Sequence, residues 1–70
     1  MNIEKFAEKV KEKLSSRRKA VVDWMFDSDG FTESEIFRVL EMLAAGNFVW
    51  VASWLYSRGY AERSDMVWEG

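Results

Sequence analysis

The sequence predicts a mostly helical α+β domain in which a three-helix core is followed by a C-terminal β-hairpin. Three observations lead to this prediction: a complete helix-capping signal at Thr32, a Gly-Asn break between two helical segments, and two strand-like segments after Arg58-Gly59. The chain of 70 residues is the size of one domain and contains no proline or low-complexity linker. We therefore treat residues 1–70 as a single domain, with residues 1–16 as an N-terminal amphipathic helical extension.

The N-terminal segment carries apolar residues at three- and four-residue spacing, which predicts an amphipathic helix. These residues are Ile3, Phe6, Ala7, Val10 and Leu14. Ser15-Ser16 interrupts the pattern, and apolar residues resume from Ala20 to Phe26. Ser16 either caps a second helix or lies within one long helix over residues 3–26, and both alternatives stay open. Asp27-Ser28-Asp29-Gly30 then predicts a turn, because these residues favour turn conformations.

A second core helix is expected to begin at about Glu33. Thr32 and Glu35 have the spacing of a capping box, and Phe31 and Ile36 have the spacing of a hydrophobic staple. After Gly46-Asn47, a third helix is expected with Val49, Ala52 and Leu55 facing the core. Its outward face would then carry Asn47, Trp50, Val51, Ser53, Trp54 and Ser57.

The last segment is expected to form the β-hairpin. Arg58-Gly59 closes the third helix, and residues 60–63 and 66–69 read as two strands joined by a Ser64-Asp65 turn. A helix, a helix and a hairpin would then follow one another along the chain.

This order resembles the winged-helix (helix-turn-helix) DNA-binding superfamily over about residues 20–70. Thr32, Ile36, Phe37 and Leu40 look like its second helix, and Val49, Ala52 and Leu55 look like the buried positions of its third. Residues 58–63 are similar to the entry into the wing. The resemblance implies a winged-helix-like fold and a role in DNA binding or transcription regulation.

Composition argues against several classes of function. The chain has no Cys and no His, which removes disulfides, thiolate nucleophiles, histidine acid–base chemistry and the usual zinc sites. We expect no enzyme, no cofactor, no metal and no small-molecule substrate. The longest apolar run, residues 48–52, is far too short for a membrane span, and the chain opens with no signal-peptide pattern. A cytoplasmic protein without membrane contact is expected.

Charge is divided unevenly along the chain, although the net charge is only −2. Residues 1–19 hold seven basic and three acidic side chains, whereas residues 20–70 hold three basic and nine acidic ones. A basic end of this kind can meet phosphate or the acidic end of a second copy. We predict contacts with the phosphate backbone of double-stranded DNA from Arg17, Arg18, Lys19, Asn47, Arg58 and Arg63.

The alternative function is a protein-interaction module that binds no nucleic acid. The third helix carries few side chains suited to reading bases, since only Asn47 and Arg58 qualify. Trp50, Val51 and Trp54 would instead anchor a homodimer or a protein partner, because Trp dominates interface energetics. Two alternatives for these Trp side chains are also open: covering by the N-terminal helix within the same chain, and base stacking or groove contact with nucleic acid.

Overall fold

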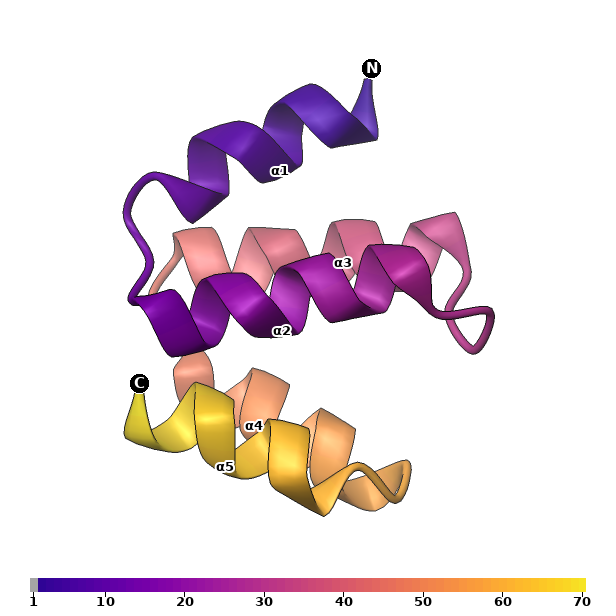
Figure 1. The fold of residues 1–70 in the computed structure, drawn as a ribbon, viewed down its shortest axis with the longest axis vertical. Coiled ribbons are helices and arrows are strands. Elements are labelled where there is room, and N and C mark those ends of the chain that lie inside the picture. The colour runs from indigo at the N-terminus through magenta and orange to yellow at the C-terminus, as the bar shows by residue number, and fades with distance from the viewer. Residues whose placement is uncertain (1) are drawn as a thin grey trace.

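The computed structural model describes residues 2–70, and over this range the chain forms five helices and no strand (Figure 1). The helices are α1 (Ile3–Lys11), α2 (Ser16–Asp27), α3 (Glu33–Ala44), α4 (Phe48–Ser57) and α5 (Ala61–Glu69). The protein is therefore all-α within residues 2–70, and the predicted α+β class is wrong. No helix in this range combines the length and the apolar character that crossing a membrane requires.

The helices are arranged around α2, which packs against α1, α3 and α5 (Figure 1). Helix α1 also lies on α3, and α4 joins α3 to the C-terminal part of the chain. Helices α4 and α5 form an antiparallel hairpin with the most extensive contact between any two helices of residues 2–70. The result is a globule of 29 × 24 × 17 Å.

Local sequence signals explain where several helices begin. The Thr32 hydroxyl accepts from the Glu35 N–H at 3.2 Å, and the Glu35 carboxylate accepts from the Thr32 N–H at 2.8 Å, so the predicted capping box is confirmed. The alternative of one long helix over residues 3–26 is excluded, because the chain leaves α1 after Lys11. Ser15, rather than Ser16, caps α2 by accepting from the Arg18 N–H at 3.3 Å.

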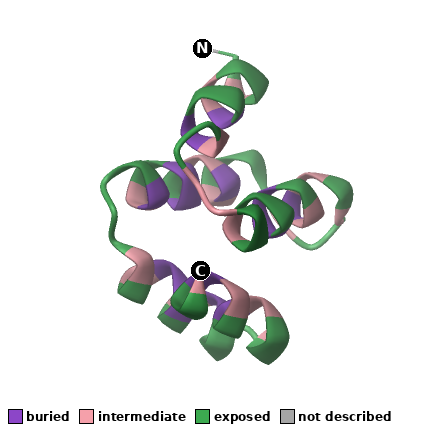
Figure 2. Cartoon of the chain, turned by 60° about the vertical axis from the view of Figure 1, so that its left-hand side comes forward, coloured by how far each residue is buried: buried purple, intermediate pink, exposed green. Residues whose placement is uncertain are grey.

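The core lies where the inner faces of all five helices meet, and Figure 2 shows the buried positions along these faces. Its largest fully buried side chains come from α2 to α5: Met25, Leu40, Leu55, Val21, Val22, Val39, Val51 and Val67. Helix α1 adds Ala7 and Val10. Burial of these apolar side chains is the main favourable contribution to folding.

The prediction of a β-hairpin over residues 60–69 is wrong, because this segment forms helix α5. Ser64 and Val67, one helical turn apart, are its buried positions, and the Ser64 hydroxyl donates to the Ala52 carbonyl at 2.7 Å. A nine-residue helix is marginal alone. Packing against α4 and α2 stabilises it, and this tertiary contact outweighs the turn preference of Ser64-Asp65.

The predicted orientation of α4 also needs correction. Ala52 and Leu55 face the core as expected, but Val49 is 56% exposed and Val51 is fully buried. Helix α4 has no charged residue, so its sequence pattern does not select one buried side. The register is decided by the helices that pack against it.

Candidate functional site

The basic cluster at the start of α2 contains both structural and exposed side chains. The Arg18 guanidinium lies 3.5 Å from the centre of the Phe48 ring, and its Nε donates to the Val67 carbonyl at 2.8 Å. Arg18 thus joins α2 to α4 and α5. Arg17 is exposed and pairs with a carboxylate of α5 at 3.6 Å, and Lys19 is exposed. Within the cluster, Arg17 and Lys19 are therefore the side chains that a ligand could contact.

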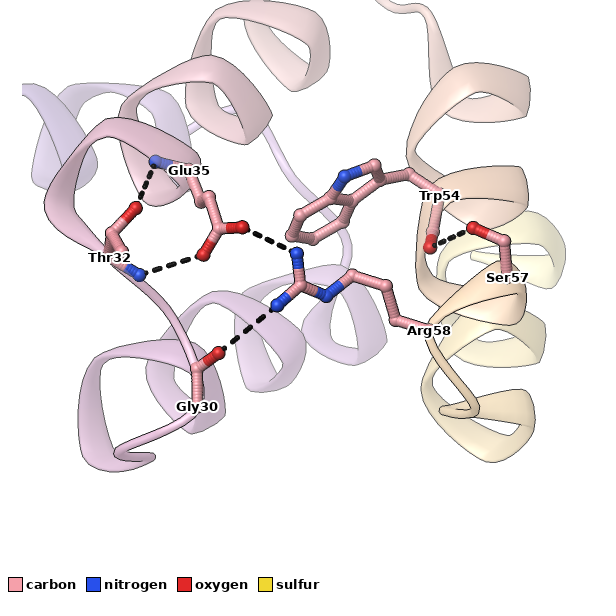
Figure 3. Close-up of polar contacts among 6 residues, drawn as sticks. All are labelled: Gly30, Thr32, Glu35, Trp54, Ser57 and Arg58. Atoms are coloured by element: carbon pink, nitrogen blue, oxygen red, sulfur yellow. Dashed lines mark hydrogen bonds and ion pairs between the residues drawn. The ribbon is translucent and has the colours of Figure 1, made fainter.

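Arg58 joins the end of α4 to the start of α3, as Figure 3 shows. Its guanidinium pairs with the Glu35 carboxylate, donates to the Gly30 carbonyl at 3.3 Å and lies 4.8 Å from the Trp54 ring. A hydrogen bond from the Thr32 N–H, followed by the bond from Arg58, lowers the pKa of Glu35 from its usual value. These contacts make Arg58 part of the fold.

Asn47 and Arg63 also serve contacts within the chain. The Asn47 side chain accepts from the Trp50 N–H at 3.2 Å and so caps α4. The Arg63 guanidinium lies 4.8 Å from the Trp24 ring and 3.6 Å from the Glu62 carboxylate. Cation–π contacts of this kind hold α5 against α2.

The residues predicted to bind nucleic acid do not form one continuous strip. Arg17 and Arg18 lie in the first turn of α2, whereas Arg63 contacts Trp24 near the last turn and Arg58 reaches Gly30 just beyond it. Helix α2 has 12 residues and therefore spans about 18 Å from one end to the other. The structure thus separates the predicted phosphate contacts into two groups.

The predicted protein anchor on α4 is largely used for intrachain packing. The Trp50 and Trp54 rings stack with their centroids 6.1 Å apart, and Trp54 lies 5.8 Å from the Phe31 ring. Both Trp side chains are half-buried, and Val51 lies in the core, where no partner can reach it. Of the two, Trp54 is covered by Phe31 and Arg58, and within residues 2–70 helix α1 does not pack against α4.

The most exposed large apolar side chains lie on the outer side of the α4–α5 hairpin. Val49, Tyr56 and Trp68 are 56%, 68% and 59% exposed. They border a groove of about 410 Å³, which we call the outer groove and define by its lining residues Val49, Ala52, Ser53, Tyr56, Ser64, Asp65 and Trp68. None of these residues was predicted as part of an interaction surface.

Helical spacing is the signal that identifies the outer groove once α5 is known to be a helix. Val49, Ser53 and Tyr56 follow one another at the i, i+4, i+7 positions of α4, and Asp65 and Trp68 are one turn apart on α5. A hairpin over residues 60–69 would have placed Asp65 in a turn and Trp68 in a strand. Because residues 60–69 were predicted to form a β-hairpin, the outer groove could not be recognised from the sequence.

A second, larger groove of about 610 Å³ lies between α1, α3 and the start of α4, and it is lined by apolar residues and by the charged side chains of Lys9, Glu12 and Lys13. Among residues 2–70, no three carboxylate side chains come together to hold a metal ion. Every buried side-chain nitrogen and oxygen in that range has a hydrogen-bond partner.

No protein family, curated protein or solved structure gives a significant match to this chain. Within residues 2–70, α5 occupies the place of the wing that the winged-helix resemblance implies. We therefore infer the function from the surface of the chain itself.

Proposed function

We propose that this protein is a non-enzymatic protein-interaction module that binds a partner through the outer groove. The observation that carries the proposal is the exposure of Val49, Tyr56 and Trp68, each above one half, around a single groove. Trp and Tyr are enriched among residues that dominate binding energy at protein interfaces. The cytoplasmic location expected from the sequence is part of this proposal.

The composition of α4 supports a partner on its outer side. Apart from Ser53 and Ser57, the residues of α4 are apolar or aromatic, and a helix with so few polar residues is ordinarily buried on most sides. Within the chain, the side of Val51 and Leu55 is covered completely, and Trp50 and Trp54 are covered in part. The remaining side, which includes Val49 and Tyr56, faces solvent.

The size of the apolar surface sets the expected strength of binding. At their observed exposures, Val49, Tyr56 and Trp68 together present on the order of 300–400 Å². Burying this area is worth about 8–10 kcal/mol before the costs of association. Those costs are about 4–15 kcal/mol, so these three side chains alone leave a net gain of at most about 6 kcal/mol, and we expect a weak, reversible complex.

Binding to double-stranded DNA stays a prediction and is the second candidate. The exposed Arg17 and Lys19, in a segment rich in basic residues, support it. The use of Arg18, Arg58 and Arg63 for contacts within the chain reduces the number of cations that a phosphate backbone could meet.

The test compares the wild-type protein with a Tyr56→Ser/Trp68→Ser double variant as baits for partner capture. A Glu4→Ser/Lys5→Ser variant on exposed α1 positions is the matched control, since it keeps the net charge and leaves the groove intact. A captured protein is then purified and titrated into the ¹⁵N-labelled chain. We expect chemical-shift changes on α4 and α5 and loss of binding only in the groove variant, provided that circular dichroism shows all baits to be folded. Binding that survives the groove substitutions contradicts the proposal.

A further inference from the structure

The shape of the outer groove fits a helix as its occupant. Its lining combines the small residues Ala52, Ser53 and Ser64 with the larger Val49, Tyr56 and Trp68. Two helices that lie side by side form a groove into which the ridge of a third helix can pack. The distance from Val49 to Tyr56 along α4 corresponds to about two helical turns. An occupying helix would therefore present an apolar stripe of about two turns.

The charge around the groove defines the second property of the occupant. On α5, Glu62, Asp65 and Glu69 follow at i, i+3 and i+7 and form an acidic row on the exposed side, while α4 contributes no charge. Glu62 and Glu69 each have an arginine at 3.6 Å. Asp65, which lines the groove, forms no ion pair with any of residues 2–70. A cationic side chain of a partner would meet this unpaired carboxylate.

We infer that the outer groove binds an amphipathic helix of a partner protein, with lysine or arginine residues beside its apolar stripe. This inference rests on the proposed function and specifies the class of partner. A second copy of this chain fits less well, because the outer groove of each copy would bring its own Asp65 to the interface.

The test uses two synthetic peptides of about 16 residues, a length at which a helix-favouring sequence can form in water. Both carry leucine at i, i+3, i+4 and i+7. One has lysine beside this stripe, and its twin has glutamate at the same positions. Each peptide is titrated into the ¹⁵N-labelled full chain and into the Asp65→Asn and Tyr56→Ser/Trp68→Ser variants, and sedimentation is measured without peptide.

We expect the lysine peptide to shift the amide signals of α4 and α5 and to bind at least threefold more tightly than its twin at low salt, with a smaller ratio at high salt. Asp65→Asn should reduce this preference, and the groove double variant should abolish binding. Equal binding of the two peptides overturns the inference about charge but leaves the proposed interaction groove standing.

Other outcomes are also decisive. Tighter binding of the glutamate peptide, or no binding of either peptide, overturns the basic-helix partner. Concentration-dependent dimerisation that is lost in the groove double variant would assign the groove to a second copy, so the proposed function would survive and this inference would fail. If neither peptide binds, no dimer forms and partner capture is unaffected by the groove substitutions, both proposals fail.

Discussion

Arg58, at the end of α4, forms an ion pair with Glu35, in the first turn of α3 and 23 residues earlier in the chain. Because Glu35 also completes the capping box with Thr32, one carboxylate secures the start of α3 and the position of α4 (Figure 3). The Arg58 side chain is partly covered, and it adds a hydrogen bond to Gly30 and a cation–π contact with Trp54. A residue that the sequence suggested for DNA contact thus has a structural role.

Substitution of Arg58 is expected to destabilise the fold. Arg58→Met removes the ion pair and the bond to Gly30 while keeping most of the side-chain volume, and we expect a loss of about 1–2 kcal/mol in the free energy of unfolding. Arg38→Met is the control, because Arg38 is exposed and, among residues 2–70, forms an ion pair with Glu41 alone, at 3.7 Å. Urea denaturation measures both variants, and equal effects would contradict the role of Arg58.

The stability contributed by Glu35 is expected to depend on pH. The hydrogen bond from Thr32 and then the ion pair with Arg58 lower its pKa from 4.5 in the folded state. The contribution is therefore complete above pH 4.5 and is lost as the pH falls through the lower folded pKa. Glu35→Gln should reduce stability near neutral pH and make less difference in acid. Thermal unfolding of both proteins across this range tests the prediction, and a constant difference at every pH contradicts it.

Truncation of two nearby valines, Val49 and Val51, should change stability by very different amounts. Val51 is fully buried and Val49 is 56% exposed. Val51→Ala should cost about 1.5–3 kcal/mol, from lost burial and an unfilled cavity, whereas Val49→Ala should change stability by less than about 0.5 kcal/mol. Chemical denaturation gives both values. A larger loss at Val49 would restore the orientation expected from the sequence and remove Val49 from the outer groove.

Substitutions at Arg17 and Arg18 should have different effects on the stability of the fold, and this difference decides which variant can test DNA binding. Arg18→Ala removes the contacts with Phe48 and Val67 and should lower stability by about 1–2 kcal/mol, while Arg17→Ala should leave it nearly unchanged. Duplex-DNA titrations at two salt concentrations should therefore use Arg17→Ala with Lys19→Ala. If the wild-type chain binds DNA, this variant should bind more weakly; an unchanged affinity would exclude the exposed basic residues from the contact.

Part of the fold could be predicted from the sequence because the relevant contacts are local. The capping box of Thr32 and Glu35, the turn at Gly46 and the end of α4 near Arg58-Gly59 each depend on residues within one or two turns. Gly46 and Gly59 adopt positive φ angles of 77° and 93°, which glycine tolerates best. Such signals require no knowledge of the neighbouring helices.

The candidate surface could not be predicted in the same way. The sequence of α4 does not indicate which of Val49 and Val51 is buried. The sequence of residues 60–69 likewise does not decide strongly between an α-helix and a β-hairpin. Three of the predicted phosphate contacts, Arg18, Arg58 and Arg63, find carbonyl, carboxylate or aromatic partners that are distant in the sequence. Their roles depend on which helices become neighbours.

The sequence by itself determined a composition without cysteine or histidine, several helix boundaries and an uneven charge distribution. Only the tertiary structure decided that α5 is a helix, that Val51 is buried and that Val49, Tyr56 and Trp68 remain exposed. The physical reason is that caps and turns are stabilised by hydrogen bonds within a few residues. The buried side of a helix without charged residues, and the formation of a helix too short to be stable alone, depend on burial between segments that are far apart in the chain.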